Sequence, residues 1–271
     1  MTRDDKKRMK IGIIGVGILG GVIKKYYEDN GYEVFCYDKF KNIGSVKEVN
    51  RANIIFICVP TPRQADNSCD ISIVDKAISY ITGSKIVVIK STVPPLTTDN
   101  LQSKYFKHRL LFNPEFLTEK RAYIDFRSPK IQLVGYTKRS EPITQNILGI
   151  LPVARFNKIV PAVAAEMFKY VRNCYLATKN SFFNQIYDLC RQIGVDYSFM
   201  KECAEADPWI GPEHLNIWQD DKRGFNGKCL PKDTEAFLKW ADSQGIDLSV
   251  LRQVVEFNSA LLASQNIKKD S

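Results

Sequence analysis

The sequence predicts an α/β fold, a Rossmann-like doubly wound parallel sheet followed by a mostly helical domain. Short apolar runs alternate with segments of helical spacing, and the first run leads directly into Gly-x-Gly-x-x-Gly. Between Pro161 and Ile193 the apolar positions recur at helical spacing for much longer than in an average helix. We therefore expect a dinucleotide-binding Rossmann domain over residues 1–150 and a helical domain over residues 151–271.

Continuous apolar runs define the strands, because parallel strands are buried on both faces. The predicted strands are Lys10–Ile14, Tyr32–Tyr37, Ile54–Val59 and Ile86–Ile89. A helix should run from the glycine motif to a C-cap near Gly31, and another should join the third and fourth strands. Ile71–Ile81 is the predicted helix between the third and fourth strands, and the remaining predicted helices are Pro161–Ile193, Ile193–Ala206 and two within Asp233–Leu262.

Composition narrows the class of protein. The chain has 271 residues, 44% of them hydrophobic and 25% charged, and no apolar run could span a bilayer or act as a signal peptide. Seven cysteines without paired spacing favour reduced thiols and the cytoplasm. The net charge of +9 suits anionic small molecules, while the scattered lysines carry no nucleic-acid signature. His108 and His214 form no ligand cluster, so we expect no metal.

The glycine motif has the context of a dinucleotide-binding fingerprint. Gly15 allows a tight turn, Gly17 lets a pyrophosphate approach the backbone, and Gly20 lets helix and strand pack closely. Asp38 ends the next strand, where its carboxylate would bind ribose hydroxyls and favour NAD over NADP, a preference that Lys39 and Lys41 weaken. The alternative is a glycine-rich turn that binds nothing.

Two further motifs follow the third and fourth strands, Cys58-Val59-Pro60-Thr61-Pro62 and Ser91-Thr92-Val93-Pro94. Both lie at carboxyl ends of parallel strands, where doubly wound sheets bind ligands. Taken singly, either motif is explained as well by proline and threonine stopping a strand and capping a helix.

Asn113-Pro114-Glu115-Phe116-Leu117-Thr118-Glu119 is typical of a helix start, with Asn113 as N-cap and Pro114 in the first position. Glu115 and Glu119 would then share a helix face. They are either a carboxylate pair that moves a proton or an ordinary acidic first turn.

Later in the chain, Lys169 and Asn173 are four residues apart in the long helix, so an ammonium and an amide project together. Such a pair can stabilise an alkoxide, although a solvated helix face is the simpler interpretation. Cys229 follows Gly224-Phe225-Asn226-Gly227-Lys228 and precedes Lys232 and Asp233. Backbone N–H groups and nearby cations would favour its thiolate, whereas most cysteines are small buried hydrophobes.

Together these motifs resemble the nucleotide-sugar dehydrogenases, the family of UDP-glucose and GDP-mannose dehydrogenases. The matching pieces are GVGILG, Asp38, CVPTP, STVP, NPEFLTE, the Lys169/Asn173 pair and GFNGKCLPKDT, from about Ile11 to Leu262. The resemblance implies oxidation of a nucleotide-sugar primary alcohol to a carboxylate with two NAD, with UDP-glucose to UDP-glucuronate as the expected conversion.

The resemblance also implies a role for each matching residue. Cys229 would capture the intermediate aldehyde as a thiohemiacetal and then carry a thioester. Lys169 and Asn173 would stabilise the charge on the oxygen, while Thr92, Glu119 and Asp233 would handle water and protons. The implied NAD contacts are Gly15, Gly17, Ile18, Leu19, Gly20, Asp38, Lys41, Val59, Pro60, Thr61, Ser91, Thr92 and Lys232. The implied substrate contacts are Glu115, Phe116, Leu117, Glu119, Lys169, Asn173, Gly224, Phe225 and Gly227.

Three features depart from the family pattern. We expect the family's C-terminal nucleotide-binding domain to be missing, because the chain stops soon after Leu262. The family's Asp-x-Arg-Ile-Gly segment, whose arginine reaches a neighbouring subunit's substrate, reads DPWIG over 207–211, and the approach to the cysteine carries Asn226 and Lys228. A homodimer through the long helix is implied by the family, although that helix could equally be an internal core helix.

Two alternatives therefore stay open. A single-step β-hydroxyacid dehydrogenase would have a similar length and a Lys-x-x-x-Asn pair but would not need Cys229. A shortened, non-catalytic NAD-binding protein would need none of the proposed catalytic residues.

Overall fold

The structure of the protein is a computed structural model that describes residues 9–219 and 222–266. The chain divides into two units. Among the described residues, the sheet unit comprises residues 9–62 and 70–169, and the helical unit comprises residues 63–69, 170–219 and 222–266. The division at Lys169/Tyr170 lies further along the chain than the predicted 150/151, because one more strand and the start of the long helix belong to the sheet unit.

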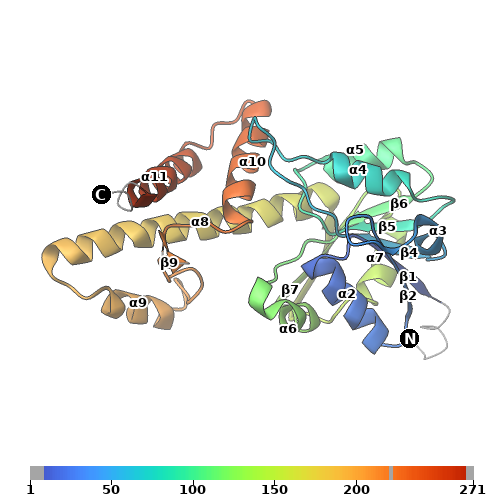
Figure 1. Ribbon diagram of the computed structural model, residues 1–271, viewed down its shortest axis with the longest axis horizontal. Coiled ribbons are helices and arrows are strands. Elements are labelled where there is room, and N and C mark those ends of the chain that lie inside the picture. The colour runs from blue at the N-terminus through green and yellow to red at the C-terminus, as the bar shows by residue number, and fades with distance from the viewer. Residues whose placement is uncertain (1–8, 220–221, 267–271) are drawn as a thin grey trace. The chain divides into compact units, whose positions relative to one another are not determined.

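Eight strands form one mixed sheet in the order β3-β2-β1-β4-β5-β6-β7-β8 (Figure 1). The β2–β3 and β6–β7 pairs are antiparallel, and the other pairs are parallel. This order confirms the predicted Rossmann-like architecture. The strands are β1 (Lys10–Ile14), β2 (Glu33–Asp38), β3 (Ile43–Gly44), β4 (Ile54–Ile57), β5 (Ile86–Ile89), β6 (Arg109–Phe112), β7 (Ile131–Tyr136) and β8 (Phe156–Pro161).

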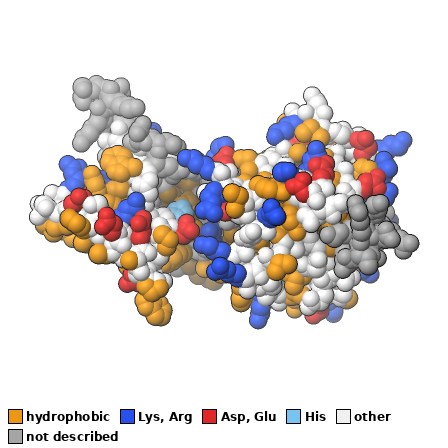
Figure 2. Space-filling model, turned by 90° about the horizontal axis from the view of Figure 1, so that it is seen from below, with side chains coloured by type: hydrophobic (Ala, Val, Ile, Leu, Met, Phe, Trp, Pro, Cys, Tyr) orange, Lys and Arg blue, Asp and Glu red, His pale blue; other side chains and the backbone are white. Residues whose placement is uncertain are grey.

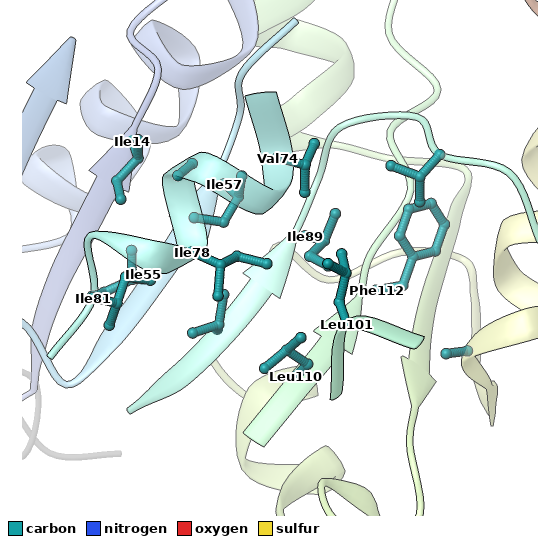
Figure 3. Packing of buried hydrophobic residues seen from close by; sticks show 14 of the residues in the cluster. Ile14, Ile55, Ile57, Val74, Ile78, Ile81, Ile89, Leu101, Leu110 and Phe112 are labelled. Carbon is teal, nitrogen blue, oxygen red and sulfur yellow. The ribbon is translucent and has the colours of Figure 1, made fainter. Parts of the chain in front are cut away.

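Helices cover both faces of this sheet, as a doubly wound fold requires. They are α2 (Ile18–Asp29), α3 (Val46–Val49), α4 (Ser72–Ser79), α5 (Thr97–Lys104), α6 (Ala122–Arg127) and α7 (Thr144–Leu148), with 3₁₀ turns η1 (Glu119–Arg121) and η2 (Glu141–Ile143). Alternate strand residues face opposite sides. Ile57, Ile89 and Phe112 therefore pack with α4 and α5 on one face (Figure 3), while Phe56 and Val88 pack with α2 on the other.

The long helix α8 (Ala162–Ile193) begins against the sheet. A side chain on Gly135 of β7 would lie 2.9 Å from the Cβ of Ala165 and 3.0 Å from the Cα of Ala162. Such a close approach is possible only at a glycine. The first turns of α8 are therefore packed on β7, which explains why the sheet unit extends to Lys169.

The helical unit is built along the rest of α8, with α9 (Tyr197–Ala206), the hairpin β9 (Trp218–Gln219) and β10 (Lys222–Arg223), α10 (Leu230–Ser243) and α11 (Ser249–Asn266) (Figure 1). Tyr170 stacks on Phe237 of α10 with ring centroids 5.3 Å apart. Residues 63–69 join this unit because Arg63 pairs with Glu235 of α10. No helix within the described ranges is long and apolar enough to cross a membrane.

Glu166, in the first turns of α8, is fully buried and holds the start of α5. Its Oε1 accepts hydrogen bonds from the backbone N–H of Thr98 at 2.8 Å and from the Thr98 hydroxyl at 2.5 Å. Its Oε2 has no hydrogen-bond partner among the described residues. Burial raises the pKa of Glu166 to about 7, although the Thr98 hydrogen bonds oppose this shift.

The raised pKa of Glu166 should make the stability of the sheet unit depend on pH. In the unfolded chain this carboxyl titrates near pH 4.3. Its protonated form favours the fold, so the free energy of unfolding falls as pH rises from about 4.3 to about 7, by up to about 3 kcal/mol in total. Glu166→Gln keeps the acceptor for Thr98 without the charge. In urea unfolding between pH 5.5 and 8.5, the free energy of unfolding of the variant should increase relative to that of the wild type as pH rises. Parallel pH profiles of the two proteins would contradict this.

Candidate functional site

The loops that carry the predicted cofactor residues lie in a row at the carboxyl edge of the sheet. Each loop begins with a backbone N–H bonded to the carbonyl of a neighbouring strand: Gly15 to Tyr37 (2.9 Å), Cys58 to Ile14 (2.8 Å), Ser91 to Ile57 (3.2 Å) and Asn113 to Ile89 (2.9 Å). The motifs recognised separately in the sequence are therefore neighbours in space. This is the edge where doubly wound sheets bind ligands.

The glycine loop has the form that a dinucleotide requires. Gly15 has φ +92°, and a side chain on Gly20 would lie 1.9 Å from the Gly15 carbonyl oxygen. Gly17 is exposed, and an added Cβ there would meet nothing within 4 Å. No side chain caps α2 at Gly17, so the N–H groups of its first turn are open to an anion. These features fit a bound pyrophosphate.

Asp38 and Lys41 hold this loop in place. Asp38 Oδ2 accepts a hydrogen bond from the Val16 N–H at 2.7 Å, and its Oδ1 accepts from the backbone N–H groups of Phe40 and Lys41 at 3.0 Å. Lys41 Nζ donates to the Val16 carbonyl at 2.7 Å. A carboxylate has lone pairs beyond these three bonds. Asp38 can therefore both fix the loop and accept from a ribose hydroxyl.

The hydroxyls of the next two loops bond the loops to each other. Thr61 Oγ1 donates to the Thr92 carbonyl at 2.8 Å, and Ser91 Oγ donates to the Val59 carbonyl at 2.6 Å. Both hydroxyl-bearing residues are buried, whereas Pro60 is exposed. The hydroxyls of Thr61 and Ser91 therefore fix the two loops to each other. A ligand at this edge would contact the exposed residues of the loops, such as Pro60.

The predicted helix at Asn113 does not form. Residues 113–118 are irregular, and the first helical turn is the 3₁₀ turn at Glu119, so Glu115 and Glu119 do not share a helix face. Asn113 is fully buried, and its amide donates to the Gln132 side chain at 2.9 Å and to the Leu133 carbonyl. The amide is engaged by β7, so it does not cap a helix.

The buried Lys90 is not part of any motif that the sequence shows. It is 2% exposed, and its Nζ donates to Asn113 Oδ1 at 2.7 Å and lies 5.6 Å from the Phe126 ring centroid. Burial lowers the pKa of Lys90 to about 8, although the nearby Cys58 and Glu115 oppose this shift. The available signal was a lysine ending an otherwise apolar strand, Ile86–Ile89.

Four predicted substrate residues are brought together in the sheet unit. Lys169 Nζ donates to the Glu115 carbonyl at 2.6 Å and to Glu115 Oε1 at 3.0 Å, and it lies 5.5 Å from the Phe116 ring centroid. Burial alone would raise the pKa of Glu115, but the charge of Lys169 and the Leu117 N–H outweigh it and hold the pKa below its ordinary value. Glu119 is exposed and stands apart from this ion pair.

A second polar cluster lies in the helical unit. Asn173 Nδ2 donates to Asp233 Oδ2 at 2.6 Å, and Lys232 Nζ donates to Asp233 Oδ1 at 2.6 Å. Asp233 is 1% exposed, so both of its oxygens are bonded away from bulk water. Lys232, predicted to contact the cofactor, is engaged here with its neighbour along α10.

Cys229 immediately precedes α10, and its thiol is exposed. Its carbonyl accepts the first hydrogen bond of the helix from the Asp233 N–H at 2.9 Å. Cys229 therefore lies at the N-terminal, positive end of the α10 helix dipole. By contrast, burial raises the pKa of Cys58 and of Cys174 to about 12, so both thiols stay protonated.

Comparison with known proteins assigns both units. The NAD binding domain of the UDP-glucose/GDP-mannose dehydrogenase family matches residues 39–148, and the family's central domain matches residues 163–260. A Rickettsia typhi UDP-glucose 6-dehydrogenase is 31% identical, with 92% of this chain and 67% of that protein aligned. The chain belongs to the UDP-glucose/GDP-mannose dehydrogenase family. The NAD binding domain of the family supports NAD as the cofactor.

Other relatives agree with this family assignment. The UDP-glucose 6-dehydrogenase of Rickettsia conorii is 35% identical over 81% of this chain and 52% of its own length. The structure of a UDP-glucose dehydrogenase from Pyrobaculum islandicum superposes with a TM-score of 0.82 at 25% identity, covering 93% of this chain and 68% of that one. The chain thus spans about half the length of curated family members such as the Rickettsia conorii protein.

Gly20 offers a test of the nucleotide loop with a matched neighbour. Gly20→Ala should abolish NAD binding, because the new methyl group cannot fit beside the Gly15 carbonyl. Gly21→Ala should bind NAD normally and gain about 0.5–1 kcal/mol in stability, since a side chain there meets nothing within 4 Å and the residue lies within α2. Calorimetric titration with NAD measures both. Equal affinities of the two variants would contradict this account of the loop.

Proposed function

We propose that the protein oxidises the primary alcohol of a nucleotide sugar to a carboxylate in two NAD-dependent steps, with Cys229 holding the intermediate. The observation that carries the proposal is an exposed thiol at the start of α10, followed one turn later by Asp233 bonded to Asn173. A single hydride transfer would have no use for such a thiol. Membership of the dehydrogenase family supports the overall reaction.

Each residue has a task in the proposed sequence. NAD supplies the acceptor for one hydride in each oxidation. As the alcohol becomes an aldehyde, Lys169 and Asn173 stabilise the charge on its oxygen, and the hydroxyl proton leaves to water or a carboxylate. The Cys229 sulfur then adds to the aldehyde carbon, giving a thiohemiacetal. Loss of a second hydride, with the proton of the thiohemiacetal hydroxyl passing to water or a carboxylate, gives a thioester. Water then hydrolyses the thioester to the acid, and the sulfur takes up a proton from that water.

Water and proton handling falls to the remaining residues of the set. We assign Thr92, Glu119 and Asp233 to this task, as the family resemblance implies. Asp233 accepts hydrogen bonds from both Asn173 and Lys232, which fix its carboxylate one turn after Cys229. Glu119 is exposed to solvent. UDP-glucose is the first substrate to test, since several relatives are named UDP-glucose 6-dehydrogenases.

Counting NADH per substrate tests the covalent mechanism. The wild type should form about two NADH for each sugar consumed, and Cys229→Ser should release no acid while still binding NAD. A screen with UDP-glucose, UDP-N-acetylhexosamines and GDP-mannose, reading NADH directly, provides the measurement. Cys203→Ser is the control, because that thiol is also exposed but lies within α9.

The same measurement separates the two other candidate functions. A ratio near one, with Cys229→Ser fully active, would favour the single-step β-hydroxyacid type. Tight NAD binding without NADH formation from any of these sugars would favour a non-catalytic NAD-binding protein. Acid release by Cys229→Ser at the wild-type rate would rule out the proposed thioester.

We further propose that the protein acts as a cytoplasmic homodimer formed through α8. Reduced thiols at all seven cysteines are compatible with a reducing compartment. Tyr175, Phe182 and Leu189 recur every seventh residue on α8 and are each more than half exposed, as is Ile193. Figure 2 shows exposed hydrophobic side chains on the part of the molecule formed by α8 and α9. An apolar stripe along a helix is typical of a surface that another helix covers.

Leu189 provides the test of this dimer. Leu189→Glu should convert a dimer to a monomer, because a carboxylate would be buried without a partner in the apolar stripe. Ile246→Glu is the control, since Ile246 is equally exposed but lies outside α8. Light scattering after size-exclusion chromatography gives the mass of each variant. A monomeric wild type, or an unchanged mass for Leu189→Glu, would contradict the proposal.

A further inference from the structure

We propose that two side-chain amides of α11, Asn258 and Gln265, are positioning residues that hold the segment leading to Cys229 by taking the place of a β-strand partner. The chemical consequence rests on the proposed function, whereas the mechanical role rests on the contacts alone. Sequence motifs drew attention to Cys229 but assigned nothing to α11.

Each amide bonds to both backbone groups of one residue. Gln265 Oε1 accepts from the Arg223 N–H at 2.7 Å, and its Nε2 donates to the Arg223 carbonyl at 3.1 Å. Asn258 Oδ1 accepts from the Phe225 N–H at 2.9 Å, and its Nδ2 donates to the Phe225 carbonyl at 2.9 Å. Paired N–H and C=O bonds to alternate residues are the pattern that a neighbouring antiparallel strand would make.

The geometry of α11 makes this pattern possible. Asn258 and Gln265 are seven residues apart, close to two helical turns, so their side chains leave the helix on one face. Asn258 and Phe225 are 4% and 3% exposed, which means that no bulk water replaces these bonds. Losing either amide would leave backbone groups unsatisfied in a buried setting.

Gly224, between the two held residues, is required for the approach of Asn258. Its φ is +91°, and a Cβ at this position would lie 2.6 Å from Asn258 Oδ1. The glycine that opens the cysteine motif is therefore explained by the amide on α11. Its predicted role as a substrate contact is not needed to account for it.

The side chain of Arg223 fixes the same segment from α8. Its guanidinium donates to both carboxylate oxygens of Asp188, at 2.6 and 2.9 Å, and to the Asn184 carbonyl at 2.9 Å, and it lies 4.6 Å from the Tyr187 ring centroid. Such a paired guanidinium–carboxylate contact fixes direction as well as position. Arg223 is thus held through its main chain by α11 and through its side chain by α8.

The hold on this segment extends to the reactive residue. Only residues 226–228 separate Phe225 from Cys229, whose carbonyl is fixed by the first turn of α10. The segment is therefore anchored at both ends, and a small loss of order at Phe225 displaces the thiol. A misplaced nucleophile loses rate steeply, because attack requires a defined distance and angle.

Hydrogen exchange and kinetics of the full chain test the proposal. Asn258→Ala and Gln265→Ala should each speed amide exchange in the peptide covering residues 222–229 by about tenfold, as expected for losing roughly one net hydrogen bond. Asn258→Ala should also lower kcat about tenfold while leaving the KM for NAD unchanged. Asn258→Asp keeps the acceptor for the Phe225 N–H and should recover part of the protection. Gln253→Ala, an exposed glutamine of the same helix, is the control.

Exchange in both alanine variants equal to the control would overturn the proposed hold, and faster exchange with an unchanged kcat would overturn its role in positioning the thiol. Gln265 lies next to the end of α11, so Gln265→Ala should fold even if Asn258→Ala does not. Circular dichroism checks that both variants are folded. If the wild type shows no Cys229-dependent turnover, the proposed function fails, while the exchange result still decides whether α11 holds the segment.

Discussion

The burial of two lysine ammonium groups at the carboxyl edge of an apolar sheet determines the shape of the loop beside it. Lys90 and Lys169 are each no more than 5% exposed, and an uncompensated buried charge costs several kcal/mol. Asn113 accepts from Lys90, and Glu115 accepts from Lys169 through both its carbonyl and its carboxylate. Both acceptors are therefore committed, and residues 113–118 cannot wind into the helix that Asn113 and Pro114 favour locally.

The strands of the sheet differ in how clearly the sequence marks them. β1, β4 and β5 are buried on both faces, so their continuous apolar runs identified them. β8 lies at the edge of the sheet and its first three residues, Phe156–Lys158, are exposed, while β7 carries the buried Gln132 and the small Gly135. Those residues are explained by partners elsewhere in the chain, namely Asn113 and the start of α8. Local sequence patterns therefore do not predict these two strands.

The candidate site shows the same division between local and distant causes. Gly15, Gly20 and Asp38 were predicted because the turn, the close approach and the strand end are features of a short segment. Lys90 and Asn258 escaped notice because their partners lie 23 and 33 residues away in sequence. A lysine or an asparagine alone is compatible with a solvated surface. Its role becomes visible only when the fold brings its partner within hydrogen-bonding distance.

Physical chemistry distinguishes Cys229 among the seven thiols. Burial raises the pKa of Cys36, Cys58 and Cys174, which removes them as nucleophiles near neutral pH. Cys69 and Cys190 are buried as well, so Cys203 and Cys229 are the two exposed cysteines. Cys203 lies in the last turns of α9. Cys229 stands immediately before the first turn of α10, and the two amides of α11 hold the segment that leads to it.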